Sequence, residues 1–261
     1  MSSEGIAVGE RRIPEDWLER RFLREAAELA LVAVAFLLYF IVRGQVVDRP
    51  EVAFANSRDL IALEQDLGIF REAAWQQAVL DSELLVRFWN FVYFWLDFPL
   101  IAALGLLMYL TRRRQYTFTR DAILFSGGIA LIAYNLYPVA PPRLVEGIGV
   151  IDTLQAYDNL SYQAQSTQFF VNPFAAVPSL HVGWSFLIAG GVLMAYGRDR
   201  WMWPFALLHP VLQSASTIFT GNHFFLDGLA GLASAAFGVL LALAMQRWGY
   251  PAMRRLVARP K

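Results

Sequence analysis

The sequence predicts an all-α protein, a polytopic membrane bundle of six transmembrane helices with interfacial amphipathic helices beside it. Three observations predict this fold class. Hydrophobic residues make up 57% of the chain, whereas soluble domains use about 45–50%. These residues fall into six long apolar runs, and arginines gather in the segments that join alternate runs. We therefore expect one integral membrane domain.

The six apolar runs give the candidate spans, which we place at 26–43, 84–110, 121–138, 180–197, 201–220 and 224–247. Each run approaches or exceeds the roughly 20 residues that cross about 30 Å of hydrocarbon as a helix. Backbone groups in lipid must be paired within the segment, and these runs do not alternate as membrane strands do, so we expect helices. The chain then divides into an N-terminal interfacial segment (1–25), a six-span domain (26–248) and a basic tail (249–261).

Two further segments are predicted to be amphipathic helices. Residues 13–25 mix large apolar side chains with Arg and Glu, a pattern typical of an interfacial helix that leads into the first span. Residues 58–80 interleave apolar residues with Asp, Glu, Arg and Gln, which suits a helix on the outer surface with a bend at Gly68. We expect this helix to pack over the bundle, and the second option is a lid over an active site.

The arginines predict the orientation of the spans. Basic residues are concentrated before the first span, after the second, after the fourth and in the tail. With six crossings these four regions lie on one side, and the positive-inside rule makes that side the cytoplasm. Both termini are then cytoplasmic, and we expect the protein in the plasma membrane of a bacterium.

Composition excludes some kinds of chemistry. The chain has no cysteine, which excludes disulfides, thiolate nucleophiles and Cys-based metal sites. It has no dinucleotide-binding or Walker glycine pattern. We therefore expect no cofactor and no nucleic-acid partner, with the lipid bilayer as the surroundings, and we assign no oligomeric state.

Two of the three histidines, His181 and His223, stand where turn residues meet the start of an apolar run. A titratable ring at the mouth of a membrane helix is costly unless it does chemistry. Under the predicted topology both lie at the outer membrane boundary, together with Arg143, Ser179 and Asp227. This convergence of separate chain regions predicts an active site that faces the outside.

The types and spacing of these residues suit phosphate chemistry. Ser179 can cap the helix that follows it, whose free N–H groups and dipole attract phosphate. Arg143 offers a planar fork of donors for two phosphate oxygens. His223 and Asp227 are four residues apart and share a helix face, so the carboxylate can fix one ring nitrogen and leave the other to attack. His181 then supplies an acid for the leaving oxygen.

Other polar residues in the apolar runs are given different roles. His209 lies before Pro210 with no acidic neighbour, so we expect it to be structural. Two histidines and one carboxylate without further ligand-spaced residues make a weak metal site, and we expect no metal. Asp97 is an acidic residue inside the second run. A non-enzymatic transporter would line its path with such residues, but charges here cluster at one face, so transport is the alternative reading.

At these residues the chain resembles the type 2 phosphatidic acid phosphatase superfamily. Its three motifs correspond to the stretch ending at Arg143, to Pro178 through His181, and to Ser216 through Asp227. The matched stretches cover a minority of the chain, but their order, spacing and six-span setting agree. As a set the motifs are highly specific.

The chain departs from the family pattern at four positions. Leu180 replaces a glycine, and Leu144 follows Arg143 where proline is usual. Leu136 and Thr217 stand where the family has a lysine and an arginine, so two phosphate-binding cations are missing. Pro-Ser-Leu-His, with Tyr-Pro-x-x-Pro-Pro-Arg and Thr-Gly-Asn-His, is more similar to the inositol phosphorylceramide synthase-like branch. Members of that branch are phosphotransferases as well as hydrolases.

The resemblance implies a role for each residue. His223 would be the nucleophile that forms a phosphohistidine, Asp227 would orient it, and His181 would protonate the leaving alkoxide and then activate the acceptor. Arg143, Ser179 and backbone N–H groups would hold the phosphoryl oxygens. Three further donors would stand in for the missing cations: Tyr137, Thr220 and Asn222. The scheme requires no metal.

The predicted function is an enzyme that cleaves or transfers the phosphate-linked headgroup of a lipid at the outer leaflet. A phospholipid or a polyprenyl phosphate would be the substrate. Hydrolysis and transfer, including transfer of a phospho-inositol-type headgroup, differ in whether water or an alcohol reaches the phosphoenzyme. The outer loop 144–177 is longer than an ordinary connector and is expected to shape access for the acceptor.

Overall fold

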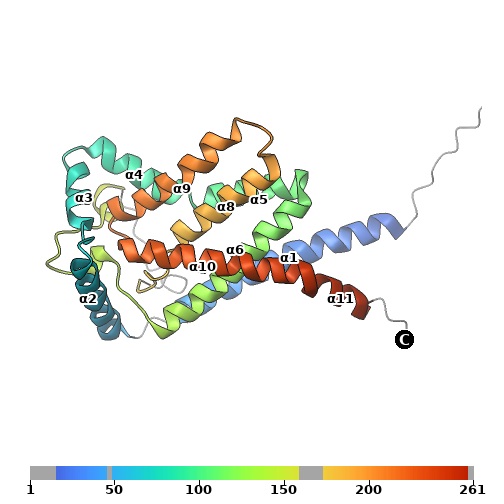
Figure 1. The fold of residues 1–261 in the computed structure, drawn as a ribbon, viewed down its shortest axis with the longest axis horizontal. Helices are drawn as coiled ribbons and strands as arrows, with labels where there is room; N and C mark the ends of the chain where they lie inside the picture. Colours follow the sequence, from blue (N-terminus) through green and yellow to red (C-terminus); the bar gives the residue numbers. More distant parts are fainter. Residues whose placement is uncertain (1–15, 46–48, 159–172, 258–261) are drawn as a thin grey trace, which may run out of the picture. The chain divides into compact units, whose positions relative to one another are not determined.

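Each regular element in the described part of the chain is a helix, as Figure 1 shows. The computed structural model describes residues 16–45, 49–158 and 173–257. For these residues the all-α prediction is confirmed. The chain divides into two units, Met1–Leu38 and Tyr39–Lys261, and the candidate site lies within the second.

Helix α1 (Asp16–Gln45) begins in the first unit and ends in the second. The predicted interfacial segment 13–25 and the first predicted span 26–43 are continuous in this helix, apart from 13–15, which lie outside the described residues. Residues 16–43 contain no glycine or proline, so nothing in the sequence ends the helix at the predicted boundary. The amphipathic segment is thus the start of the same helix.

The second unit is a bundle in which α6, α8 and α10 pack against one another and α9 packs against α8. Its helices, coloured in chain order in Figure 1, are α2 (Pro50–Asp66), α3 (Glu72–Leu80), α4 (Glu83–Trp95), α5 (Phe98–Thr111), α6 (Arg113–Leu136), η1 (Pro142–Leu144), α7 (Thr153–Asp158), α8 (Leu180–Tyr196), α9 (Met202–Phe219), α10 (Phe225–Ala244), η3 (Met245–Gly249) and α11 (Tyr250–Val257).

The second predicted span, 84–110, is broken. Helices α4 and α5 are bent by 43° where they meet, at Leu96 and Asp97. Proline at position 99 accounts for the break, because in a continuous helix its ring would clash with the carbonyl of Trp95, four residues earlier. The prediction of one continuous helix here is therefore wrong, and the break places an acidic residue inside the bundle.

The segment 58–80 also forms two helices, α2 and α3. The chain turns between them at Gly68, whose φ of +71° favours glycine, so the bend predicted at this residue is confirmed. Helix α2 begins earlier than predicted, at Pro50, because proline suits the first turn of a helix. Helix α2 packs against α10 and α3 against α9, so the pair covers part of the bundle.

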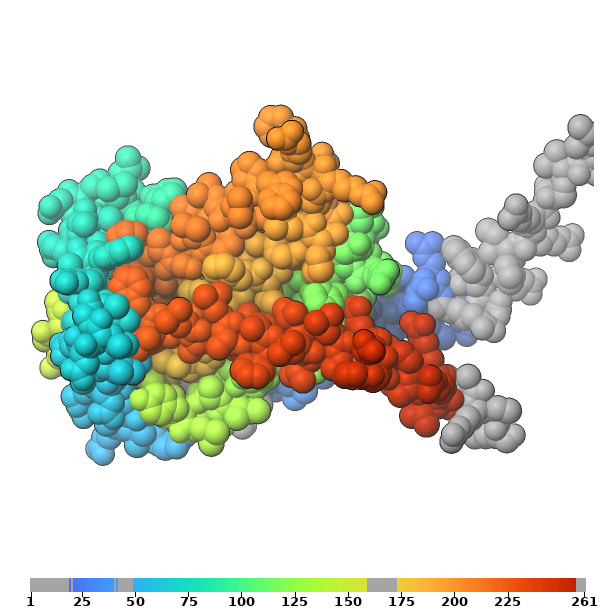
Figure 2. All heavy atoms as spheres, viewed as in Figure 1, coloured from blue at the N-terminus to red at the C-terminus, as the bar shows by residue number. Residues whose placement is uncertain are grey.

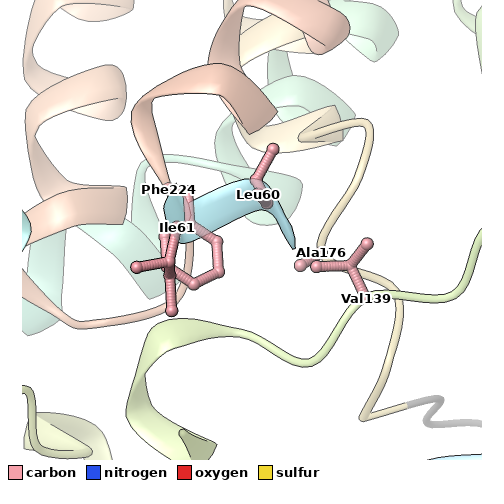
Figure 3. Close-up of a cluster of buried hydrophobic side chains, with 5 residues drawn as sticks. All are labelled: Leu60, Ile61, Val139, Ala176 and Phe224. Atoms are coloured by element: carbon pink, nitrogen blue, oxygen red, sulfur yellow. The ribbon is translucent and has the colours of Figure 1, made fainter. Parts of the chain in front are cut away.

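A buried apolar cluster joins α2 to the chain just before α10 (Figure 3). Its members are Leu60, Ile61, Val139, Ala176 and Phe224. Val139 and Ala176 come from segments that run side by side, because the backbone N–H of Ala176 donates to the Val139 carbonyl at 3.3 Å. The cluster thereby packs Phe224, the residue that follows His223, against α2.

The described helices differ in whether they are long and apolar enough to span a membrane. One continuous stretch, Phe225–Leu256, is long and apolar enough to cross a membrane by itself, and the bent α4–α5 pair is a second if it counts as one span. Helix α8 is apolar but has 17 residues. The six-span bundle therefore stays a prediction.

Helix α10 runs along the face of the second unit that Figure 2 shows. Large apolar side chains project outward from this helix, each more than half exposed: Leu229, Phe237, Leu240 and Leu243. Such an apolar surface on one helix suits contact with lipid.

The starts of α8 and α10 lie unusually close together. A Cβ built on Gly231 would lie 2.1 Å from the carbonyl oxygen of Ser179, and one built on Gly183 would lie 2.6 Å from the carbonyl oxygen of Gly231. The backbone N–H of Ser179 also donates to the Asp227 carbonyl at 2.9 Å. Small residues at both positions let the two backbones approach, as small residues do in tightly packed pairs of membrane helices.

We expect Gly231→Ala to lower the melting temperature of the detergent-purified protein, because overpacking of this kind costs about 1–3 kcal/mol. Gly228→Ala is the matched control, since its Cβ would meet Val182 at 3.6 Å, an ordinary contact. Alanine is about 1 kcal/mol better than glycine inside a helix, so the control should melt at or above the wild-type temperature. Equal melting temperatures for the two variants would contradict the close approach.

Candidate active site

A cavity of about 290 Å³ opens among α4, α5, α6, α8 and the chain before α10. Its apolar lining includes Phe94, Phe98, Leu180 and Trp184. Its polar lining consists of Tyr39, Tyr93, Asp97, Tyr134, Arg143, His181, Asn222 and His223. The cavity thus combines an apolar wall with two imidazoles and a guanidinium.

The two imidazoles lie beside each other, as the sequence predicted. The ring centroids of His181 and His223 are 5.7 Å apart, with the rings inclined at 56°. His181 is the second residue of α8, and His223 precedes α10 by two residues. The close approach of the two helices at their glycines therefore sets this distance.

The ring of His223 is held at one nitrogen. Its Nδ1 lies 2.9 Å from the carbonyl oxygen of Ala176 and 3.2 Å from Oδ2 of Asp227. A carbonyl oxygen can only accept, so Nδ1 carries the hydrogen and Nε2 carries the lone pair in the neutral ring. Asp227 is fully buried, and its Oδ2 also accepts from the Phe224 N–H at 2.8 Å. One carboxylate thus caps α10 and orients the imidazole.

Ser179 caps α8, as predicted. Its hydroxyl accepts from the Val182 N–H at 3.4 Å, and the residue is fully buried. The cap occupies this hydroxyl, so the donors that α8 can direct at an anion are its own first N–H groups.

Arg143 is anchored on three sides. Its backbone N–H donates to the Gly221 carbonyl at 2.9 Å, its Nη1 donates to the side-chain oxygen of Asn222, and its Nε lies 3.1 Å from Oδ2 of Asp152. The guanidinium side chain is 11% exposed. These contacts hold a nearly buried cation at the edge of the cavity.

The three donors expected to replace the missing cations are placed differently from one another. Asn222 lines the cavity, but its oxygen accepts from Arg143 and its Nδ2 donates to Thr220 Oγ1 at 2.7 Å. Thr220 is buried, and its hydroxyl donates to the Ser216 carbonyl at 2.7 Å. Tyr137 is 40% exposed and its hydroxyl lies 3.5 Å from the Asn56 carbonyl. Of the three, the structure brings Asn222 to the cavity.

His209 has the structural position expected for it. It is buried inside α9, and its Nε2 lies 2.8 Å from the carbonyl oxygen of Leu96, at the α4–α5 break. In the described part of the chain, no group of three or more His, Asp or Glu side chains is arranged to hold a metal ion.

Two buried glutamates from the 58–80 segment contact the start of α10. Glu64 Oε1 accepts from the Leu226 N–H at 2.8 Å, and Glu72 Oε1 accepts from the Phe225 N–H at 3.1 Å. Both side chains have no exposed surface. Burial, and then a hydrogen bond with Glu72, raises the pKa of Glu64 to about 9. The segment therefore provides hydrogen-bond acceptors for the first N–H groups of α10. Sequence reasoning missed this role because the charged residues of the segment look like those of a solvated helix face.

Residues 144–158 and 173–177 are the described parts of the predicted outer loop, and 159–172 lie outside the described residues. The first part supplies Asp152 to Arg143 and Asp158 to α4, where it pairs with Arg87 at 2.6 Å. Asp97 and Tyr93 line the cavity, and sequence reasoning gave neither of them a part in the site. For Asp97 the signal was present, as a charge inside an apolar run.

We expect Glu64→Gln to remove a pH-dependent loss of stability. The folded-state pKa of about 9 lies above the ordinary value of 4.5, so the stability from this carboxyl is complete below about pH 4.5 and is lost as the pH rises towards 9. Glutamine mimics the protonated acid, so the melting temperature of the variant minus that of wild type should grow between pH 5 and pH 9. Glu51→Gln, exposed in the same helix, is the control; a difference that stays flat with pH for Glu64→Gln would count against the buried proton.

Comparison with known proteins places the chain in a family. Residues 58–241, more than half of the chain, match the family described as the PAP2 superfamily, which is the type 2 phosphatidic acid phosphatase superfamily that the motifs resemble. Neither this match nor the structural one below tests the inositol phosphorylceramide synthase-like branch, which stays a prediction. A search of curated proteins finds no sequence match.

Among solved structures, the chain is similar to the crystal structure of Aquifex aeolicus LpxE, with a TM-score of 0.50 and 17% sequence identity. The alignment covers 68% of this chain and 94% of that one. At this level of identity the likeness shows a shared fold.

Proposed function

The chain belongs to the PAP2 superfamily, and we propose that it is a membrane lipid phosphatase that works through a phosphohistidine at the extracytoplasmic face. A phospholipid or a polyprenyl phosphate is the proposed substrate. The observation that carries the proposal is the pair of imidazoles 5.7 Å apart in one cavity, beside the guanidinium of Arg143.

The first step is attack of His223 Nε2 on the phosphorus. The Nδ1–H of the same ring is fixed by Ala176 and Asp227, which keeps the lone pair on Nε2 and stabilises the charge that develops on the ring. As the N–P bond forms, the bond from phosphorus to the lipid oxygen breaks. His181 gives its proton to that oxygen, so the lipid leaves as a neutral alcohol.

The second step releases the phosphate. His181, now neutral, takes a proton from water, and the hydroxide oxygen bonds to phosphorus as the N–P bond breaks. This returns His223 with its lone pair and His181 with its proton. An alcohol in place of water gives transfer by the same sequence of bonds.

Arg143 and the start of α8 are the proposed binding groups for the phosphoryl oxygens. A guanidinium can donate two parallel hydrogen bonds to them, and the first N–H groups of a helix favour an anion. Donors that are already in place act on the charge of the transition state without reorganising, which is usually the largest catalytic term. Asn222 and Asp152 hold the guanidinium in position.

The proposed orientation rests on the arginines. The loops expected in the cytoplasm carry most of the basic residues, and the cavity lies near the opposite ends of the first, third, fourth and sixth predicted spans. With six spans, both termini are cytoplasmic and the active site opens on the outer leaflet. The plasma membrane of a bacterium is the proposed location.

Replacement of the histidines tests the mechanism. We expect His223→Ala to abolish turnover of a lipid phosphate and to abolish trapping of a phosphorylated protein from labelled substrate. His181→Asn should slow turnover by about 10²–10⁴-fold, the usual contribution of a general acid. His209→Gln keeps a donor for the Leu96 carbonyl and should retain activity. Turnover in folded His223→Ala at the wild-type rate would end the proposal.

Transfer of a phosphodiester headgroup is a second candidate, which the charges of the cavity favour. Among the described residues, Arg143 is the single Lys or Arg that lines the cavity, and Asp152 pairs with it. Residues 159–172 contain no Lys or Arg. A phosphate monoester carries a charge of about −1.5 to −2 at pH 7, whereas a diester carries a single negative charge, which one guanidinium balances better.

Matched lipids distinguish the two candidates. Purified protein would be given phosphatidic acid or phosphatidylinositol with the same acyl chains, with and without an alcohol acceptor, and products would be measured by mass spectrometry. Phosphate release from the monoester is the result expected of a phosphatase. Headgroup transfer from the diester without phosphate release would favour the second candidate, and no turnover of any phospholipid or polyprenyl phosphate would contradict both.

A further inference from the structure

We propose that Asp97 is a positioning residue for His181, so that the site contains two carboxylate–imidazole pairs instead of one. The proposal rests on the proposed function, in which His181 transfers a proton to and from the reacting oxygens. It assigns a role to an acidic residue that the family motifs do not include and that lies far from them in sequence.

The first observation is the position of the carboxylate. Asp97 Oδ2 lies 3.3 Å from His181 Nε2, and the Asp97 side chain is 8% exposed. Asp97 stands at the N-cap position of α5, yet its side chain makes no capping hydrogen bond. The carboxylate is therefore directed at the imidazole and not at the helix that it begins.

The second observation is the break between α4 and α5. A buried carboxylate among apolar side chains is costly unless it has a charged or donating partner. The 43° bend at Asp97 turns this residue into the cavity, where the imidazole is such a partner. Pro99 produces the bend. The same interruption of the helix therefore brings the Asp97 carboxylate to the cavity.

The third observation is the contact on the face of the same ring. Tyr93 stacks on His181, with ring centroids 4.2 Å apart and an angle of 16° between the planes. Tyr93 is four residues before Asp97, at the end of α4. The end of α4 and the break thus hold the imidazole both on its face and at Nε2, which fixes its plane and its rotation.

These contacts define which ring nitrogen reacts. With Nε2 held by Asp97, Nδ1 is the nitrogen that gives its proton to the lipid oxygen in the first step and receives one from water in the second. The other titratable or charged groups around this ring are His223 at 5.7 Å and, in the cavity lining, Arg143, Tyr39, Tyr93 and Tyr134. Asp97 is the acidic side chain among the described residues that line the cavity, so it is the group that favours the protonated ring.

Asp97→Asn tests the proposal with two substrates that differ in leaving group. For a lipid phosphate, whose alkoxide needs a proton, we expect turnover to fall by about 10²-fold, at the lower end of the contribution of a general acid. The basic limb of its pH–rate profile should move to lower pH, because the imidazolium loses a neighbouring anion. For an aryl phosphate, whose phenolate leaves without a proton, the initial burst of phenol should persist while steady turnover slows.

The controls separate positioning from folding. Asp97→Glu restores a carboxylate and should recover part of the lost rate. Asp121→Asn removes another buried, ion-paired carboxylate, which contacts Arg120 and Tyr250 away from the cavity, and should leave the burst and the pH profile unchanged. Equal losses of the burst and of lipid turnover in Asp97→Asn would mean a structural role and would overturn the proposal, as would wild-type kinetics.

A measurement on the wild-type protein covers the case in which Asp97→Asn does not fold. In ¹⁵N-histidine NMR spectra, assigned with His181→Asn, the neutral His181 ring should carry its hydrogen on Nε2; a hydrogen on Nδ1 would overturn the proposal. A failure of the proposed function is distinguishable from this, because wild-type protein would then show no turnover that depends on His223.

Discussion

The contact between the first turns of α8 and α10 is the constraint on which the site depends. Ser179 donates from its backbone to Asp227, and the glycines at 183 and 231 let the two backbones meet. Each helix begins with a histidine at or just before its first turn, so this one contact sets the distance between the rings. A larger residue at either glycine would separate the two helix starts, and with them the two imidazoles.

Buried carboxylates stabilise the start of the helix that carries the proposed nucleophile. Three consecutive N–H groups, of Phe224, Phe225 and Leu226, donate to Asp227, Glu72 and Glu64 in turn. A helix start this well satisfied has little freedom to shift, because each donor would lose a buried partner. This arrangement makes ionisation of Glu64 unfavourable, because burial raises the pKa of its carboxyl group to about 9. The α2–α3 pair therefore supports the site by holding the start of α10, a role that does not require it to move as a lid.

Those parts of the site that depend on local spacing were predictable from sequence, and those that depend on the rotation or interruption of a helix were not. His223 and Asp227 share a face at a spacing of four, and Ser179 caps the helix it precedes. By contrast, nothing local indicates that Tyr137 lies 40% exposed near Asn56 while Asn222 supports Arg143. The same holds for the fold. Apolar runs predicted helices, but their periodicity alone did not indicate that Pro99 breaks the second run into two helices.

The site holds more acidic than basic side chains, and the geometry explains why an anionic substrate is still expected there. Asp227 and the two glutamates accept from fixed N–H groups, and Asp152 pairs with the guanidinium. Each of these carboxyl groups therefore has a fixed donor beside it, and Glu64, whose pKa is about 9, adds no negative charge at neutral pH. The groups directed into the cavity are Arg143, the start of α8, the two imidazoles and Asp97, which pairs with His181. A single guanidinium with an imidazolium matches a phosphoryl group of modest charge, so the charge state of His181 sets the anion that the cavity accepts.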